Sequence, residues 1–413
     1  MHTLGIDFGT SNSAAGVSVN GAPWLIEMEP GENTLPTAVF FDPQSKQMQI
    51  GHRAVRALIN GEEGRFLRAL KSLLGTPLLH EERRLGGERI TFVTVISRFL
   101  AQIKQRAEAA TGLTFTHALS GRPVYFHSAD MARNAQAEQD LRTCYLEAGF
   151  QDVRFMFEPV AALRATSPVK GYGLIADIGG GTSDFTVFHQ DTAGQTDILA
   201  SHGLRLGGTD FDRQISIDTV MPLLGAGSEI RNSFGPDTHT APKRIFNELA
   251  TWQLIPFVYA PESRRLAADL AQFATEPAKL ARLVGVLEYE LGHDVAFAVE
   301  RGKIAANKAS EATTANAEIS LAMVEPQLKA ALPANALAAT MAPLAKQITQ
   351  QAQKALALAD IPAEQVNRVV LVGGSALMGI VQSELAALCP NAKLDAQNAM
   401  TAVASGLALA AAD

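Results

Sequence analysis

Residues 4–13 read LGIDFGTSNS, and residues 174–184 read LIADIGGGTSD. In both stretches an apolar run typical of a buried strand ends in an aspartate, Asp7 or Asp177, and glycines and hydroxyl side chains follow. The two aspartates are about 170 residues apart, which is too far for a solenoid repeat and suits a duplicated domain. A third stretch, residues 369–375 (VVLVGGS), also passes from apolar residues into a glycine turn. The sequence therefore predicts two related lobes, each built around such a strand and turn.

Strand-like runs alternate with segments of helical periodicity along the whole chain. The expected strands are Leu4–Phe8, His117–Leu119, Val153–Phe157, Leu174–Ile178 and Val369–Val372. The expected helices are Val93–Ala110, Ala129–Ala148, Leu328–Ala359 with breaks at its prolines, and Met378–Leu388. This alternation predicts an α/β fold in which helices cover parallel sheet layers.

The composition excludes several classes of protein. Hydrophobic residues make up 47% of the chain and charged residues 19%, a balance that favours a packed core over disorder. The net charge of −7 argues against a nucleic-acid partner. Two cysteines are too few for a disulfide framework or a cysteine zinc site. Neither a signal peptide nor an apolar stretch long enough to cross a bilayer is evident, so we expect a cytoplasmic protein without a membrane partner.

The glycine turns have the chemistry of a phosphate site. Without a Cβ atom, backbone N–H groups can approach phosphate oxygens closely. Hydroxyl donors are available from Thr10, Ser11, Thr182 and Ser375. An aspartate at each strand end would repel a polyphosphate unless a divalent cation lay between, and Mg²⁺ prefers one or two carboxylates together with phosphates and water. We therefore expect Asp7 and Asp177 to hold a hydrated Mg²⁺ beside a nucleotide. The first turn lacks the GxGxxG fingerprint, and the chain has no GxxxxGK[ST] loop.

The three turns resemble the two phosphate loops and the adenosine loop of the actin-like ATPase superfamily. Further motifs resemble the heat shock protein 70 (DnaK-type) branch, namely residues 70–75 (LKSLLG), 157–162 (FEPVAA) and 206–212 (LGGTDFD). The motifs keep the order of that family from Leu4 to Gly406. The resemblance implies an actin-like ATPase (ribonuclease H-like) fold, with two duplicated lobes around a central nucleotide cleft. It also implies ATP or ADP and Mg²⁺ as ligands, and leaves open whether K⁺ is needed.

The resemblance also sets the expected domains. Residues 1–168 would form lobe I of the nucleotide-binding domain, and residues 169–413 would form lobe II with an expanded subdomain around 213–365. Prolines within 221–283 predict mostly short helices and loops there. The interval from residue 213 to residue 299 is longer than the resemblance suggests. This extra segment would be either a binding site for a partner or a surface decoration without a function of its own. No peptide-binding domain is expected, because the chain ends just after the helix that would close the ATPase domain.

The resemblance assigns roles to individual residues. Phosphate and nucleoside contacts would come from Gly9, Thr10, Ser11, Asn12, Gly179, Gly180, Gly181, Gly207, Gly208, Gly373, Gly374 and Ser375. Lys71 would neutralise the γ-phosphate and position the attacking water. The water and the ion shell would be ordered by Glu158, Asp177, Thr182 and Asp184. Such roles agree with phosphoryl transfer, which depends on positioning and charge neutralisation.

On the adenosine side the sequence departs from the family. The i, i+3 and i+7 spacing puts three side chains on one helical face, where they would hold the ribose and adenine: Glu300, Lys303 and Asn307. Ile304 and Leu377 stand where the family has the arginines that sandwich the adenine, and Met400 replaces an aspartate. An apolar slot can still hold the base, without the cation–π contribution of about 1–2 kcal/mol.

Four functions are compatible with these motifs. The leading hypothesis is a slow Mg²⁺-dependent chaperone ATPase that moves its lobes and is read by a protein partner or co-chaperone. A second is a nucleotide sensor that binds without hydrolysis, which the three adenosine-side changes favour. An actin-like filament protein is a third, although the Lys71 segment resembles the chaperone branch. A sugar or acetate kinase is the fourth, and no acceptor-site motif supports it.

Overall fold

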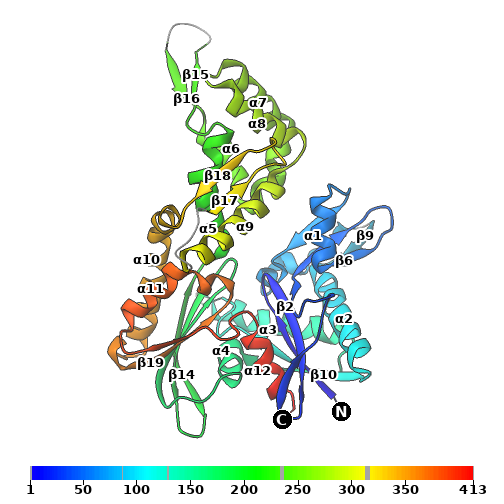
Figure 1. Ribbon diagram of the computed structural model, residues 1–413. Helices are drawn as coiled ribbons and strands as arrows, with labels where there is room; N and C mark the ends of the chain where they lie inside the picture. The colour runs from blue at the N-terminus through cyan, green and yellow to red at the C-terminus, as the bar shows by residue number, and fades with distance from the viewer. Residues whose placement is uncertain (1, 86, 128–129, 233–236, 312–316, 413) are drawn as a thin grey trace. The chain divides into compact units, whose positions relative to one another are not determined.

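The computed structural model describes residues 2–85, 87–127, 130–232, 237–311 and 317–412. The chain forms two compact units (Figure 1). Unit 1 comprises Met1–Arg205, Gln350–Leu377 and Leu385–Asp413. Unit 2 comprises Leu206–Thr349 and Met378–Glu384. The predicted mixed α/β class is confirmed, and none of the described helices is both long and apolar enough to cross a membrane.

The first large sheet of unit 1 has the strand order β11-β10-β1-β2-β3, with β4 on β2. These strands are β1 (His2–Phe8), β2 (Asn12–Val19), β3 (Ala22–Leu25), β4 (Leu35–Pro36), β10 (Phe115–Arg122) and β11 (Asp152–Phe157). Successive side chains of β1 point to opposite faces of the sheet. Leu4, Ile6 and Phe8 are fully buried, and the Phe8 ring lies 5.9 Å from that of Phe99. On the other face Gly5 leaves room for the C-terminal helix, since a Cβ there would lie 2.6 Å from the Leu407 carbonyl carbon.

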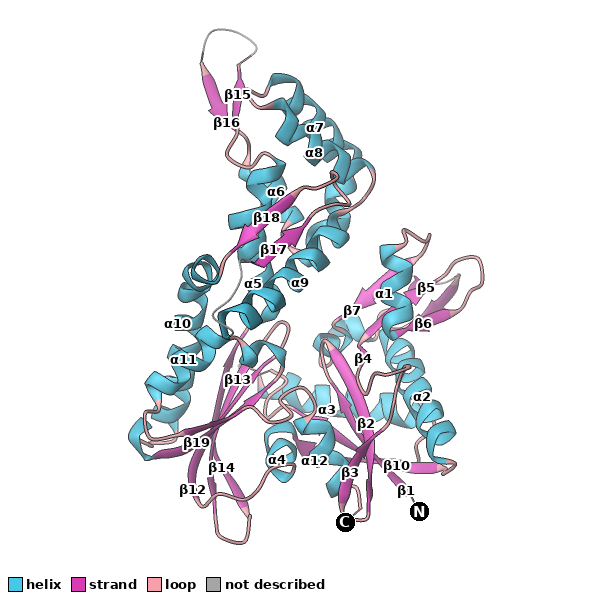
Figure 2. Cartoon of the chain, in the orientation of Figure 1, coloured by secondary structure: helices cyan, strands magenta, loops and turns pink. Residues whose placement is uncertain are grey.

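The second large sheet, also in unit 1, has the order β14-β13-β12-β19-β20 (Figure 2). Its strands are β12 (Gly171–Ile178), β13 (Ser183–Gln190), β14 (Thr196–Leu204), β19 (Val366–Val372) and β20 (Lys393–Asp395). Strand β12 pairs antiparallel with β13 and parallel with β19. Strand β1 likewise pairs antiparallel with β2 and parallel with β10. The two strand–turn stretches are therefore similar both in sequence and in how their strands pair.

Two helices join the sheets through a common core. They are α4 (Glu158–Arg164) and α12 (Ala402–Ala410), and α12, red in Figure 1, lies beside α4 and the first sheet. Their apolar side chains form one buried cluster with residues of both sheets, including Leu119, Ile175, Val370 and Leu407. Gly406 permits this contact, because a Cβ there would lie 1.6 Å from the Ala161 carbonyl oxygen.

The remaining elements of unit 1 cover the first sheet and extend from it. The strands are β5 (Ala38–Phe41), β6 (Met48–Ile50), β7 (Arg65–Arg68), β8 (Arg83–Leu85) and β9 (Glu88–Ile90). The helices are α1 (Gly51–Ile59), η1 (Leu70–Leu73), η2 (Pro77–Leu79), α2 (Phe92–Thr111), α3 (Met131–Glu147), η6 (Ala363–Gln365) and η7 (Gly374–Leu377). Helix α2 packs on α3 and on β2, and the buried side chains of these elements belong to one hydrophobic core cluster.

Unit 2 is mainly helical. Its elements are α5 (Gly208–Ile215), η3 (Ser216–Val220), η4 (Met221–Leu224), β15 (Glu229–Arg231), β16 (Thr238–Thr240), α6 (Lys243–Leu249), η5 (Trp252–Tyr259), α7 (Pro261–Phe273), α8 (Pro277–Glu288), α9 (Gly292–Glu311), β17 (Ala317–Ser320) and β18 (Lys329–Leu332). Helices α7 and α8, of 13 and 12 residues, are longer than the prolines predicted. Pro261 and Pro277 begin these helices instead of breaking them, since the first helical position needs no N–H donor.

Two helices contribute residues to both units, namely α10 (Ala334–Leu358) and α11 (Gly379–Leu388). The predicted helix over 328–359 is wrong at its start, because β18 occupies residues 329–332. It is also wrong at Pro343, which lies inside α10 without ending it.

The close contact at Gly406 predicts opposite effects for two glycine-to-alanine changes. Gly406→Ala should lower the free energy of unfolding by at least about 3 kcal/mol, because the new methyl group meets the backbone of α4. Gly285→Ala in α8 should raise it by about 0.5–1 kcal/mol, since nothing lies within 4 Å of that Cβ and alanine favours the helix. Urea unfolding measures both changes. Equal effects of the two variants would contradict the described packing of α12 on α4.

Candidate functional site

The three glycine turns gather in unit 1. The turn between β1 and β2 approaches the turn between β12 and β13, since a Cβ on Gly180 would lie 2.3 Å from Ser11 Oγ. The turn after β19 joins them, because Ser375 Oγ donates a hydrogen bond of 3.1 Å to the Gly179 carbonyl. Gly373 has φ +83°, and a Cβ there would lie 2.4 Å from the Ile178 carbonyl oxygen. Glycine is thus needed at Gly373, where a Cβ would meet backbone, whereas at Gly180 the Ser11 hydroxyl could rotate away.

These turns are accessible although their strands are buried. Gly9, Thr10 and Ser11 are half-buried, and Asn12 is exposed. In the second turn Gly179, Gly180 and Gly181 are half-buried and Thr182 is exposed. In the third turn Gly373 and Ser375 are half-buried and Gly374 is exposed. The predicted phosphate-loop residues therefore lie on one accessible region of unit 1.

A buried ion pair joins two further predicted residues. Lys71, in η1, places Nζ 2.5 Å from Glu158 Oε1 at the start of α4. The side chains are only 9% and 13% exposed, although 87 residues separate them in the sequence. Burial opposes the Lys71 charge, but the carboxylates of Glu158 and Asp7 outweigh it and raise the pKa of the ammonium above its ordinary value. Lys71 therefore carries a positive charge at neutral pH.

Three aspartates surround this pair. Asp177 on β12 and Asp184 on β13 are direct cross-strand partners, an arrangement that is unfavourable for two like charges. Burial and the Glu158 charge raise the pKa of Asp7 to about 7 and that of Asp184 to about 6. Burial, Glu158 and Asp184 raise the pKa of Asp177 well above its usual range. The Lys71 charge and the hydrogen bond from Thr182 lower the pKa of Asp184, but they do not outweigh these effects.

The donor set suits a hard divalent cation. Burial first, and then the charges of neighbouring carboxylates, disfavour the ionised forms of Asp7 and Asp177, and a bound cation would offset both effects. Among the described residues no three His, Cys, Asp or Glu side chains are arranged to hold a metal ion by themselves. Mg²⁺ needs no such cage, because one or two carboxylates with water and phosphates complete its shell. Asp7 and Asp177 fit that requirement.

The remaining predicted residues belong to unit 2. Lys303 Nζ on α9 lies 2.8 Å from Asp212 Oδ1 and 3.5 Å from the Gly208 carbonyl oxygen. Asn307 Oδ1 accepts a 2.9 Å hydrogen bond from the Gly379 amide, whereas Glu300 is exposed. Gly207 caps α5 and donates its N–H to Asp210 Oδ2. Lys303 and Asn307 thus hold α9 to neighbouring elements, and their contact with a nucleoside stays a prediction.

One residue near the site was missed from the sequence. Asp140 on α3 is 2% exposed and accepts a hydrogen bond from the loop that carries Lys71. A helical aspartate is normally solvent-exposed, so nothing in the local pattern distinguishes Asp140 from a surface residue. Its burial depends on the packing of a loop 65 residues away in the chain.

Comparison with known proteins identifies the family of the chain. The family model described as Hsp70 protein matches residues 3–91, 80–223 and 293–412. The chain therefore belongs to the Hsp70 family and has its actin-like ATPase fold. A chaperone protein DnaK from Endomicrobium trichonymphae is 32% identical over 222 residues, which cover 51% of this chain and 34% of that protein. The match thus spans about a third of the relative's length.

The aspartate cluster predicts a stability that falls as the pH rises. The native pKa values of about 7 for Asp7 and about 6 for Asp184 exceed the 3.8 of an unperturbed aspartate. The native state therefore binds more protons than the unfolded state between about pH 4 and 7, so unfolding becomes easier through that window. In chelator, Asp7→Asn should raise the free energy of unfolding at pH 8 by at least about 1 kcal/mol and reduce its dependence on pH.

The control is Asp42→Asn, because hydrogen bonds from Ser45 and Gln44 lower the pKa of that exposed carboxyl. This change removes no unfavourable charge and should not stabilise the protein at pH 8. Urea unfolding at pH 5.5 and 8 measures both variants. A wild-type protein that is more stable at pH 8 than at pH 5.5 would contradict the described electrostatics.

Proposed function

We propose that this chain binds ATP with Mg²⁺ at the three glycine turns of unit 1 and hydrolyses it slowly to ADP and phosphate. The observation that carries the proposal is the buried Lys71–Glu158 pair among three aspartates, beside accessible glycine turns. Membership of the Hsp70 family supports the same activity. The cluster joins residues from distant parts of the chain, which a set of ordinary surface loops would not require.

Each residue has a task that suits phosphoryl transfer. The backbone N–H groups of Gly9–Asn12 and Gly179–Thr182 bind phosphate oxygens, and Gly373–Ser375 lies on the nucleoside side. Asp7 and Asp177 hold the hydrated Mg²⁺, which neutralises phosphate charge when bound. Lys71 neutralises the γ-phosphate, and Glu158 fixes its position.

Asp184 and Thr182 complete this arrangement. The Asp184 carboxyl, with a pKa of about 6, is ionised in most molecules at neutral pH and can accept a proton from the attacking water. The hydrogen bond between Thr182 and Asp184 orients that carboxyl. Water activation next to a positive point charge is the main chemical task that such a site must perform.

The wider proposal concerns lobe motion. Residues 1–168 and 169–413 act as the two lobes, with the expansion at 213–365, and nucleotide binding changes their relative position. A protein partner or co-chaperone in the cytoplasm reads this change. The alternative is a nucleotide sensor with idle hydrolysis. It is favoured by the apolar Ile304 and Met400, which are 46% and 51% exposed, in place of charged side chains.

Replacing Lys71 tests the proposed hydrolysis. Lys71→Ala should slow single-turnover ATP hydrolysis at least about 100-fold, because the charge that stabilises the transition state is lost. The ATP dissociation constant should change much less. Phosphate release is measured with protein in excess and with Mg²⁺ and K⁺ present. Lys104→Ala is the matched control, since Lys104 also lies in unit 1 and pairs with Glu108 away from the turns.

Two outcomes would count against this proposal. Hydrolysis that survives Lys71→Ala would remove Lys71 from the mechanism. Tight ATP binding without any phosphate release by the wild-type protein would make the chain a nucleotide sensor.

Position 304 tests the adenosine side. Ile304→Arg should tighten ATP binding by about 5- to 30-fold, because a guanidinium over the base adds a cation–π contact of about 1–2 kcal/mol. Ile304→Gln, similar in length but uncharged, should leave the affinity within about twofold. Tripolyphosphate binding separates base stacking from general charge attraction. If Ile304→Arg tightens tripolyphosphate as much as ATP, residue 304 does not face the base.

A further inference from the structure

The loop that carries Lys71 has a backbone that needs support. Ala69, two residues before Lys71, has φ +57°, a left-handed conformation that costs a non-glycine residue free energy. Gly75, four residues after Lys71, has φ +73°, and a Cβ there would lie 2.5 Å from the Arg133 carbonyl oxygen. Such a conformation persists only where surrounding contacts hold it.

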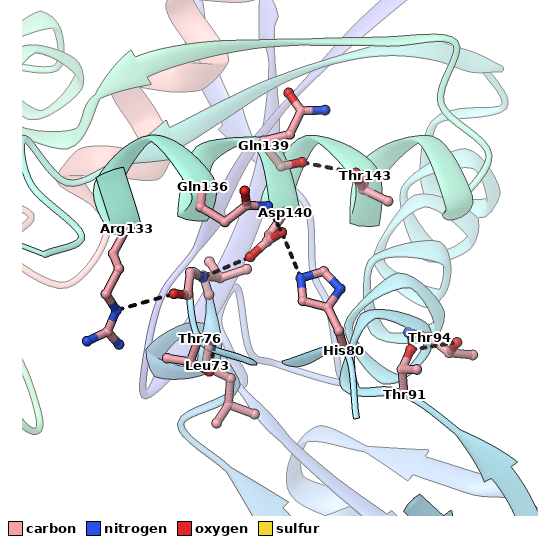
Figure 3. A network of polar contacts seen from close by, with 12 residues as sticks. Leu73, Thr76, His80, Thr91, Thr94, Arg133, Gln136, Gln139, Asp140 and Thr143 are labelled. Carbon is pink, nitrogen blue, oxygen red and sulfur yellow. Dashed lines mark hydrogen bonds and ion pairs between the residues drawn. The ribbon is translucent and has the colours of Figure 1, made fainter. Parts of the chain in front are cut away.

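Helix α3 supplies these contacts, and Asp140 is at their centre (Figure 3). Asp140 is 2% exposed and accepts three hydrogen bonds. The donors are the Gly75 amide at 2.9 Å, Gln136 Nε2 at 2.8 Å and, in the corresponding tautomer, His80 Nε2 at 3.1 Å. The Gly75 and His80 bonds connect Asp140 to both ends of the turn after η1, because η2 lies between these two residues.

Two more contacts fix the same turn. Arg133 Nε donates to the Gly75 carbonyl at 3.3 Å, and His127 Nε2 lies 2.8 Å from the Leu74 carbonyl oxygen. The apolar side chains of Leu70 and Leu74, on either side of Lys71, are each 1% exposed. Both backbone groups of Gly75 are thus held by α3, and the segment from residue 70 to 75 is fixed against it.

We propose that Asp140 is a positioning residue for Lys71. By accepting the Gly75 N–H, the Asp140 carboxylate holds the loop so that Lys71 Nζ stays within 2.5 Å of Glu158. A carboxylate suits this task because bonds to an ionised acceptor are stronger than bonds to a neutral one. The hydrogen bonds that Asp140 accepts among the described residues come from Gly75, His80 and Gln136, none of which belongs to the turns, so its effect passes through the loop. The consequence for hydrolysis rests on the function proposed above, whereas the effect on Lys71 does not.

The first test follows the Lys71 amine directly. In nucleotide-free protein treated with acetic anhydride, Lys71 should be protected by burial and by its ion pair. Asp140→Ala should raise the acetylation rate of Lys71 at least tenfold, as measured by peptide mass spectrometry. Lys104 is the internal control, because it is 17% exposed, ion-paired and in the same unit. The acetylation rate of Lys104 in Asp140→Ala should stay within about twofold of its rate in the wild-type protein.

Two further variants separate positioning from general damage to α3. Asp140→Asn keeps an oxygen for the Gly75 N–H and should restore most of the Lys71 protection. Glu147→Gln alters a carboxylate of the same helix that bonds Ser97 on α2, and should leave Lys71 protected. The proposal is overturned if Lys71 stays protected in Asp140→Ala, or if Lys71 and Lys104 lose protection together.

The second test uses hydrolysis. Asp140→Ala should slow single-turnover hydrolysis about tenfold with the ATP dissociation constant within about threefold. In the Lys71→Ala background the same change should have less than a twofold effect, because Asp140 acts only through Lys71. Full additivity of the two changes would overturn the proposal. If the wild-type protein hydrolyses no ATP, the proposed function fails, and the acetylation result still decides the role of Asp140.

Discussion

The buried pair of Lys71 and Glu158 is the interaction on which the site depends. Four carboxylates, those of Glu158 and the three aspartates, interact with one ammonium inside unit 1. One positive charge cannot balance four negative charges away from water, and the raised pKa values of Asp7 and Asp177 are the direct consequence. A protein keeps such an unfavourable cluster when a ligand completes it. The proposed divalent cation with a polyphosphate would balance this charge beside the turns.

The duplicated strand–turn units explain how these charges come together. In each of these two stretches, both in unit 1, an aspartate lies at the end of a central strand, and the next strand pairs antiparallel with it. Asp7 and Asp177 therefore reach the same region from two sheets. The core that α4 and α12 share with both sheets connects the two strand–turn stretches within unit 1. The absence of a side chain at Gly406 lets α12 approach the backbone of α4 closely.

Much of the fold could be predicted from the sequence because its signals are local. Apolar runs that end in glycine turns predicted β1, β12 and β19, and helical periodicity predicted α2, α3 and α11. The prolines were misread, since Pro261 and Pro277 start helices and Pro343 lies within one. The same residue type stops or starts a helix depending on its position, which composition alone does not reveal.

Long-range contacts were harder to predict. Lys71 and Glu158 were each named only through a family resemblance, and their ion pair was not predicted, because the two residues are far apart in sequence. Asp140 was not predicted at all, since its burial depends on a loop that folds onto α3. Residues 221–283 were the least readable part of the sequence, and the family match also leaves residues 224–292 outside its ranges. Local patterns define elements, whereas a site is defined by how those elements pack.

The most direct measurement is the number of protons released when the protein binds ATP with Mg²⁺ at pH 7. Calorimetric titration in two buffers with different ionisation enthalpies measures this number. Asp7 has a pKa of about 7, so its carboxyl holds a proton in about half of the free protein molecules. Burial and the neighbouring carboxylates Glu158 and Asp184 also raise the pKa of Asp177. A bound cation should displace these protons, and the account predicts Mg²⁺-dependent binding with net proton release that decreases in Asp7→Asn. Binding that is independent of Mg²⁺, or binding without proton release, would contradict it.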